Sequence, residues 1–377
     1  MKRMNMGGAI KVLLACALFL ATFGWGGGAA FAAPAPVGAV YVLTNAAAGN
    51  AVAVFQRAAD GTLTADGTVS TQGLGTGAGL GSQGALALSE NGHWLFAVNA
   101  GSNDISVLRI EHNGLRFVSR TASGGISPIS LTVDDDLLYV LNAGSNNITG
   151  FHITDGGHLR PLAGSTQPLS GANVGPAQIS FAPDGRTLVV TEKATNQIDT
   201  YAVGHNGVAQ APVVHASAGV TPFGFAFAGR NHLIVSDAFG GAANAGALSS
   251  YNLSKDGDLD TVSALAYTQQ TAPCWVATTG NGRYAYTTNA GSGTISGYRV
   301  HHDGRLSLLD ADGRTGVLAA ASHPIDLGVS HNSRFLYALT TGTPLGIAGF
   351  RVAEDGSLTA LPGVGGVPAS AAGLVAW

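Results

Sequence analysis

The chain repeats one phrase, in which an apolar strand ends in a polar residue and runs into a turn-like segment. Clear copies read LFAVNAGSN at residues 95–103, LYVLNAGSN at residues 138–146 and AYTTNAGSG at residues 285–293. A repeat of about 50 residues that contains only strand signals predicts the blades of a β-propeller. The polar residues that close these strands recur at spacings of 43 to 54 residues: Asn45, Asn99, Asn142, Glu192, Asp237, Asn289 and Thr340.

Each copy is predicted to contain four strands, because four runs rich in alternating apolar residues are separated by turn residues. The copy that begins at Ser127 has its expected strands at residues 128–133, 137–142, 148–153 and 159–164. The turn between the third and fourth strands contains Asn-Gly, Asp-Gly or Gly-Gly, and such pairs suit hairpin turns with positive φ. The repeat is therefore read first as architecture.

One blade is expected to be built from both ends of the chain. The first copy opens at residues 37–45 with no inner strand before it, and residues 366–377 resemble an inner strand without a blade of its own. Pairing the two would close the ring and remove the open sheet edges. The predicted fold is an all-β, seven-bladed propeller of four-stranded antiparallel blades, a single domain over residues 33–377 that is closed by the C-terminal strand.

Residues 1–32 have the order of a secretory signal peptide, with basic residues, an apolar run and an Ala-x-Ala site before Ala33. The apolar run is too short for a good membrane span, so a secreted or periplasmic protein is expected. Cleavage there would leave 15 Lys and Arg against 22 Asp and Glu, which argues against a nucleic-acid partner. Cys274 would be the only cysteine left, so no internal disulfide is expected, and the chain is predicted to act as a monomer.

Antiparallel blades sort their loops onto two faces. The loops between the second and third strands, and those between one blade and the next, share a face that we call the mouth face. The polar residues that close the second strands belong to this face, as do the segments GPAQ, TPFG, APCW and HPID that open the inner strands. Few basic residues fall there, so a neutral to acidic mouth that binds a small molecule is predicted.

The blades, the YVxN strand ends and the proline-led inner strands resemble the seven-bladed lactonase family, which includes bacterial 6-phosphogluconolactonases and carboxymuconate lactonising enzymes. The resemblance implies an active segment that reads Gly-x-x-Pro-Arg-His, then Phe-x-Pro-Asp-Gly, then a strand that ends in Asn-Glu. The corresponding segment here is NVGPAQISFAPDGRTLVVTEKATN at residues 173–196. It keeps Pro176 and Glu192, but Ala177 stands where the family has Arg, and Gln178 where it has His.

Two functions stay open on this basis. The first is an exported hydrolase or cycloisomerase-like enzyme for a neutral lactone, with Glu192 as general base and Gln178 as the donor to the carbonyl group. The second is a non-catalytic propeller that binds a ligand or a protein, because the family's Arg and His are missing. The candidate catalytic residues are Glu192, Gln178 and Asp237, and the candidate substrate-binding residues are Trp275, Asp326, Lys193, Asn142 and Asn289.

No cofactor and no metal ion are predicted. The G-x-G-x-x-G pattern at Gly79–Gly84 precedes a strand and does not link a strand to a helix, as a dinucleotide site would need. The segment Asp256–Asp260 begins like a calcium loop but lacks the following glycine and the distal glutamate. His301 and His302 are adjacent in an extended segment, so their side chains are expected to point apart.

Overall fold

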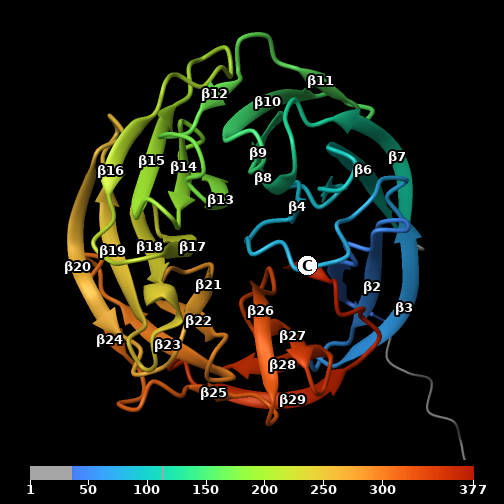
Figure 1. The fold of residues 1–377 in the computed structure, drawn as a ribbon. Coiled ribbons are helices and arrows are strands. Elements are labelled where there is room, and N and C mark those ends of the chain that lie inside the picture. The colour runs from blue at the N-terminus through green and yellow to red at the C-terminus, as the bar shows by residue number, and fades with distance from the viewer. Residues whose placement is uncertain (1–35, 113) are drawn as a thin grey trace, which may run out of the picture. The chain divides into compact units, whose positions relative to one another are not determined.

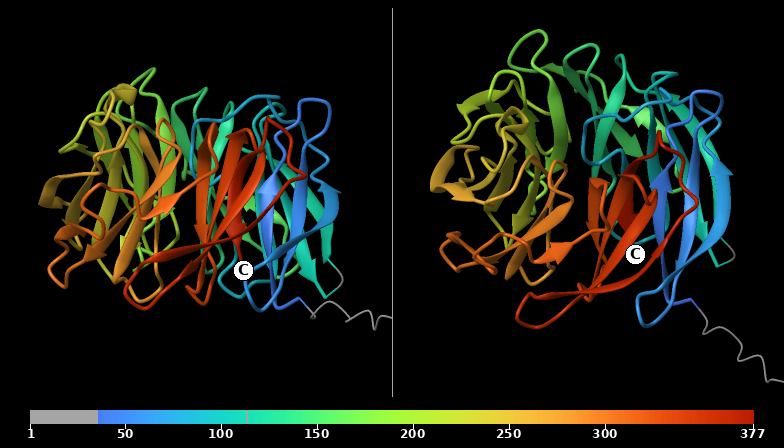
Figure 2. Two further views of the ribbon diagram at one scale, coloured as in Figure 1. Left: turned by 90° about the horizontal axis from the view of Figure 1, so that it is seen from below. Right: turned by 60° about the horizontal axis from the view of Figure 1, so that its bottom comes forward.

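Seven antiparallel sheets are arranged in a ring, and their innermost strands lie next to the centre (Figure 1). The structure, a computed structural model, describes residues 36–112 and 114–377, so the predicted signal peptide lies outside the described residues. The strands run roughly along the axis of the ring, and the loops gather at its two faces (Figure 2). The predicted seven-bladed propeller is confirmed.

The blades follow one another in chain order, each from the inner strand outward. The first four blades contain β30 (Ala372–Ala376), β1 (Gly38–Leu43), β2 (Ala51–Arg57) and β3 (Leu63–Ser70); β4 (Leu86–Leu88), β5 (Trp94–Asn99), β6 (Asp104–Glu111) and β7 (Gly114–Ala122); β8 (Pro128–Asp134), β9 (Leu137–Asn142), β10 (Asn147–Ile153), β11 (Leu159–Pro161) and β12 (Gln167–Pro168); and β13 (Pro176–Phe181), β14 (Thr187–Glu192), β15 (Gln197–Ala202) and β16 (Val213–Ala216).

The last three blades contain β17 (Pro222–Ala228), β18 (His232–Asp237), β19 (Ala247–Leu253) and β20 (Leu259–Tyr267); β21 (Pro273–Thr278), β22 (Tyr284–Asn289), β23 (Thr294–Val300), β24 (Leu306–Leu308) and β25 (Gly316–Val317); and β26 (Ser322–Val329), β27 (Phe335–Gly342), β28 (Gly346–Val352) and β29 (Leu358–Val364). A short 3₁₀ helix, Phe239–Gly241, follows β18. No helix among the described residues is long and apolar enough to cross a membrane.

The outer strand of the third blade is shorter than predicted. The expected strand at residues 159–164 ends at Pro161, and pairing with β10 resumes only at β12. Proline has no N–H to donate to a ladder, and Gly164 has a φ of 79°, which takes the chain out of the extended conformation. The outer edge of this blade is therefore broken into two short strands.

The ring closes as predicted, through β30 at the C-terminus. This strand pairs antiparallel with β1, with Val40 opposite Ala376 and Tyr41 opposite Val375. The carbonyl oxygen of Trp377 also accepts hydrogen bonds from Nε and Nη2 of Arg57, at 3.2 and 3.1 Å. The first blade thus holds both ends of the propeller together.

The repeated phrase connects neighbouring blades. In the third, sixth and seventh blades, the tyrosine of the repeated phrase donates its hydroxyl hydrogen to the glycine carbonyl of the hairpin turn in the next blade. Tyr139 does so to Gly207 at 2.7 Å and Tyr286 to Gly356 at 2.8 Å. Both glycines have positive φ, as the Asn-Gly and Asp-Gly pairs predict. The tyrosines of the repeated phrase therefore have a structural role, because each fastens its blade to the next.

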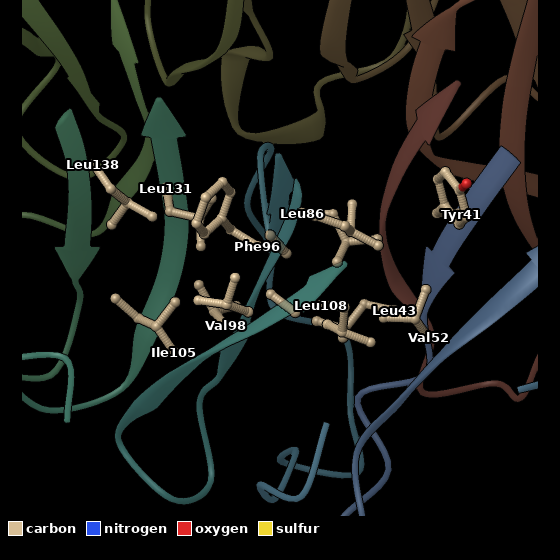
Figure 3. Close-up of a cluster of buried hydrophobic side chains, with 14 of the residues drawn as sticks. Tyr41, Leu43, Val52, Leu86, Phe96, Val98, Ile105, Leu108, Leu131 and Leu138 are labelled. Atoms are coloured by element: carbon tan, nitrogen blue, oxygen red, sulfur yellow. The ribbon is translucent and has the colours of Figure 1, made fainter. Parts of the chain in front are cut away.

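The hydrophobic core lies mainly between the blades. One cluster joins the first three blades, with Leu43 from the first, Phe96 from the second and Leu131 from the third (Figure 3). These side chains alternate along their strands with residues that face the opposite neighbour, which is why the strands are apolar on both faces. Each blade is thereby fixed against the two beside it, and the loops of the mouth face are held by a rigid ring.

Candidate functional site

Five inner strands open at the mouth face with the same local structure. Each has a proline among its first three residues, and the pairing register shifts directly after that proline, so that the next residue lies in a β-bulge. These residues are apolar, and four of them are buried. In blades 4 to 7 they belong to one cluster, which places them around the centre. We call them the collar: Ile129, Ala177, Phe223, Cys274 and Ile325.

The segment of residues 79–84, which we call the inner loop, enters the ring inside the collar. It belongs to the connection between β3 and β4 and projects toward the centre of the ring (Figure 1). Its hydrogen bonds reach three other blades. Oγ of Ser82 donates to the carbonyl of Ile129 at 2.9 Å, and the amide of Gln83 donates to the carbonyl of Ala177 at 3.1 Å. The centre is thus closed by the chain itself at this level.

Lys193 directs its amine toward the inner loop. Nζ donates to the carbonyl oxygen of Gly81 at 2.5 Å and lies 4.7 Å from the centroid of the Phe223 ring. Among the described residues no carboxylate lies within ion-pair distance of this amine. Burial against the collar lowers the pKa of Lys193 to about 8, because the charged form loses water that nothing of opposite charge replaces. The mouth therefore contains an amine that changes its charge near neutral pH.

Glu192, the predicted general base, is fully buried and points into its own blade. Its two carboxylate oxygens accept hydrogen bonds from the amide and hydroxyl of Ser170 at 3.0 and 2.5 Å, and one also accepts from Thr195 at 2.6 Å. A general base must reach the water it activates, and this carboxylate has no exposed surface. The assignment of Glu192 as general base is not supported by this placement.

A second carboxyl group, Asp199 on β15, lies beside Glu192. The amide of Ser170 donates to both, at 3.0 Å to Glu192 and at 3.1 Å to Asp199. Burial, and next the adjacent Glu192, raises the pKa of Asp199 well above its usual range, which favours the protonated form of Asp199. The shared partner is the loop that enters this blade, and the pair acts there as a structural clamp.

Asp237 occupies the equivalent place in the fifth blade and is also fully buried. It accepts hydrogen bonds from Ser249 at 2.5 Å and Ser217 at 3.5 Å. Burial raises the pKa of Asp237 to about 7, an effect that these two hydrogen bonds oppose. The structure therefore does not bring Asp237 and Glu192 together in one cleft, since each is enclosed in its own blade.

Gln178, Trp275 and Asp326 share one repeat position, as predicted, but contact other blades and not the mouth. The amide group of Gln178 pairs with the backbone of Phe225, Nε1 of Trp275 donates to the carbonyl of Ser82 at 2.9 Å, and Asp326 accepts from the amide of Leu374 at 2.9 Å. Each of the three side chains is less than 9% exposed. Asp326, Asp237 and Glu192 are therefore buried and give the mouth none of the acidic character that the sequence predicted.

Asn142 and Asn289, the remaining predicted binding residues, are fully buried at the ends of β9 and β22. Nδ2 of Asn142 donates to Asn147 at 3.0 Å, and Nδ2 of Asn289 donates to Thr294 at 3.0 Å. Both bonds fasten the turn that follows the strand. The polar residue that closes the second strand is thus a structural position in these blades.

Two features of the site were missed by the sequence analysis. Asp199 lies seven residues after Glu192, the same separation that places Ser106 after Asn99 and Ser296 after Asn289, and a comparison of repeats at that position would have revealed it. The inner loop had a signal in its glycines, but the pattern was tested only as a dinucleotide site. Its partners lie up to 193 residues away, so local sequence could not locate it.

A cavity also lies elsewhere, between the outer parts of the sixth and seventh blades. It has a volume of about 420 Å³ and is lined by apolar residues and glycines, including Leu318, Ile347, Phe350 and Leu361. No titratable side chain lines it, so it offers no acid or base for a reaction. Within the part of the chain that the structure describes, no group of three or more His, Cys, Asp or Glu residues could hold a metal ion.

The fold and the sequence both point to the lactonase class of propellers. The family described as Lactonase, 7-bladed beta-propeller, has a sequence model that matches residues 39–170 of this chain. This match confirms the resemblance that the sequence indicated, and the structure shows the fold to be a seven-bladed propeller.

Among particular proteins, the chain is similar to 6-phosphogluconolactonase of Serratia proteamaculans. The two are 26% identical over 281 residues, which cover 71% of this chain and 80% of that protein. A solved structure from Lactobacillus plantarum covers 90% of this chain and 99% of its own, with a TM-score of 0.72 and 18% identity. The periplasmic gluconolactonase of Pseudomonas aeruginosa covers 90% and 98%, with a TM-score of 0.69 and 16% identity. The two structural likenesses concern the fold.

Proposed function

We propose that the chain is an exported lactonase-like enzyme that opens the ring of an uncharged lactone at the mouth face. The observation that carries this proposal is the amine of Lys193, which is half-buried against the collar and has no carboxylate within ion-pair distance among the described residues. It follows Glu192 directly, at the end of the segment that resembles the family's active segment. The similarity to a 6-phosphogluconolactonase supports lactone hydrolysis as the class of reaction.

The proposed chemistry uses the neutral amine of Lys193 as general base. The amine takes a proton from a water molecule while the water oxygen attacks the lactone carbonyl carbon. The ring C–O bond then breaks, and the ammonium group returns its proton to the leaving alkoxide. The products are a hydroxyl group and a carboxylic acid, which ionises. A base works best when its pKa lies near the working pH, and burial lowers the pKa of Lys193 to about 8.

An uncharged substrate fits the charges at the mouth better than a phosphorylated one. A phosphate group needs arginine or lysine donors, and the position that the resemblance marks for arginine holds Ala177, which is fully buried beneath the inner loop. The amine of Lys193 is partly neutral near pH 8 and faces an aromatic ring.

Hydrolysis of a panel of lactones tests the proposal. We expect kcat/KM for an uncharged lactone to rise with pH and level off above about pH 8. Lys193→Met should lower kcat/KM by about 10²- to 10⁴-fold, the usual contribution of a general base. Lys255→Met is the matched control, because Lys255 lies in an exposed hairpin turn. Full activity in Lys193→Met, or efficient turnover of 6-phosphogluconolactone with uncharged lactones left intact, would overturn the proposal.

A second candidate function is a propeller that binds a small ligand without changing it. The observation in its favour is that each carboxylate of the predicted site accepts hydrogen bonds from its own or the neighbouring blade. Calorimetry with the same lactone panel separates the two functions. Binding with no product after long incubation, at pH values up to 9, would favour the binding protein.

We also propose that the chain is exported and acts as a monomer. The support for export is the order of basic, apolar and small residues before Ala33 in the sequence. Size-exclusion chromatography with light scattering measures the mass of the exported protein, and a mass of twice the chain or more would contradict the monomer.

A further inference from the structure

One side chain joins the fourth blade to the fifth by a paired hydrogen bond. Nε2 of Gln178 donates to the carbonyl of Phe225 at 3.0 Å, and the amide of Phe225 donates to Oε1 of Gln178 at 2.7 Å. Gln178 lies two residues after the proline of its inner strand, and Phe225 lies three residues after the proline of the next. This arrangement is a clamp between neighbouring inner strands.

The fifth blade cannot make the same clamp to the sixth, because its equivalent residue is Gly224. The two backbone groups that such a side chain would reach belong to Val276, three residues after the proline of the sixth blade. Gln83 of the inner loop pairs with them instead, at 2.7 Å from Nε2 to the carbonyl and 3.0 Å from the amide to Oε1. Gln83 therefore supplies from the second blade the clamp that the fifth blade lacks.

Gly224 provides the space for this side chain. A Cβ atom at Gly224 would lie 2.1 Å from Oε1 of Gln83 and 2.5 Å from the carbonyl oxygen of Cys274, both closer than real contacts. Its backbone φ is not in the left-handed region, so conformation alone would allow another residue there. The glycine is needed for the close approach of both Gln83 and the backbone of β21, and we call the pairing of Gln83 with Gly224 the lock.

The lock fixes the carbonyl that holds Lys193. Gly81 lies two residues before Gln83, and Ser82 between them is held on both sides, by the carbonyl of Ile129 and by Nε1 of Trp275. With its last residues fastened, the inner loop presents the carbonyl of Gly81 to Nζ of Lys193 at 2.5 Å.

We propose that Gln83 is a positioning residue for Lys193, acting through the inner loop to hold the amine at the mouth in its partly dehydrated state. That this position of Lys193 serves catalysis rests on the proposed function. That Gln83 holds Lys193 in this position does not. Gln83 differs in this respect from Gln178, which makes the same kind of clamp without contacting the inner loop or Lys193 through its side chain.

Competitive labelling of amines tests the placement without any assay of activity. The full chain has four lysines, and only Lys193 and Lys255 lie in the described part, so peptide mass spectrometry can follow the two separately. Trace acetic anhydride applied over pH 6 to 11 gives the labelling midpoint of Lys193, with Lys255 as the reference in the same sample. In the unchanged protein we expect a midpoint near 8 for Lys193.

Gln83→Ala should raise this midpoint by about one pH unit or more, because a loosened loop lets water reach the amine. Gln83→Met, which keeps the length of the side chain but makes no clamp, should shift it in the same direction and guards against misfolding of the smaller variant. Gln178→Ala is the matched control, since it breaks an equivalent clamp one blade earlier. It should lower the melting temperature by a similar amount but leave the midpoint unchanged.

Equal shifts in the Gln83 and Gln178 variants would show a merely structural role and overturn the proposal, as would no shift in either Gln83 variant. If the proposed function is right, the pH–rate profile of Gln83→Met will move together with its labelling midpoint. If the unchanged protein hydrolyses no lactone, the proposed function fails, while the labelling experiment still decides whether Gln83 positions Lys193.

Discussion

Deletion of Pro368–Trp377 should destabilise the whole propeller, because this segment contains β30, the inner strand of the first blade. The deletion removes the ladder to β1 and exposes one edge of that strand. It also removes Leu374, which is 5% exposed and packs against the seventh blade. Arg57, itself buried, loses the acceptor of two of its hydrogen bonds.

The size of the effect can be worked from these contacts. Loss of a buried leucine costs about 2–5 kcal/mol, and each ladder hydrogen bond contributes about 0.5–1.5 kcal/mol. Hydrogen bonds to a charged group contribute about 1.5–3 kcal/mol, and Nη1 of Arg57 already has no partner. The leucine and the two bonds of Arg57 alone amount to about 5–11 kcal/mol before any ladder bond is counted, which is comparable with the free energy of unfolding of an ordinary domain.

Thermal and urea denaturation of the full and truncated chains measures the loss. We expect the truncated chain to aggregate or to melt at a much lower temperature. Trp377→Ala is the control, because it keeps the strand and the carbonyl that Arg57 binds, and removes only the ring that packs 4.9 Å from His331. A truncated chain that melts like the full one would refute the reasoning about closure, and an equal loss in the control would assign the effect to the tryptophan ring.

Gly224→Ala should lower the melting temperature and displace Gln83 from its hydrogen bonds with Val276. Faster hydrogen exchange at the amide of Val276 measures this displacement, and an unchanged exchange rate would contradict the lock. Burial raises the pKa of Asp326 to about 8, so the folded state keeps a proton that the unfolded chain releases above about pH 4, and stability should fall as the pH rises from about 4 to about 8. Urea denaturation of the unchanged protein and of Asp326→Asn across this pH range measures how the free energy of unfolding changes with pH. A decrease that remains after the substitution would be due to other groups. Burial raises the pKa of the Cys274 thiol to about 12, so a thiol reagent should modify it only as the protein unfolds; rapid labelling at pH 8 in the native state would disprove this. N-terminal sequencing of exported protein should begin at or near Ala33, whereas an intact Met1 on cytosolic protein would argue against export.

The sequence alone predicted the ring, the number of blades and the closing strand, because these depend on signals that repeat. Alternation along each strand and the glycine turns identify the four strands, and the unpaired first and last segments identify the closure. The outer strand of the third blade was overextended to Gly164, since period-2 patterns are weak at solvent-exposed edges. Strand ends were therefore less predictable than strand order.

The candidate site was predicted less well, for a physical reason. Glu192 and Asp237 differ from the asparagines of other blades in charge, and the difference was interpreted as chemistry, yet each carboxylate accepts hydrogen bonds inside its own blade. Whether a polar strand end faces solvent depends on the loop from the preceding blade, which local sequence does not locate. Lys193 was predicted only as a substrate-binding residue, and its contact with Gly81 depends on a segment 112 residues earlier in the chain.

The lock between Gln83 and Gly224 has a consequence for the order in which the protein folds. Most contacts in a propeller join strands that follow one another, and such local closures are fast. The clamp on Val276 instead joins positions 193 residues apart, so the fifth and sixth blades cannot complete their junction until the second blade has arrived at the centre. Synthesis from the N-terminus makes the inner loop before its partners exist, and the loop must wait as an exposed, glycine-rich segment. The late steps of folding are therefore expected to tie distant blades together, and a circular permutant that separates residues 79–84 from the rest of the second blade should fold more slowly than one opened at an outer hairpin.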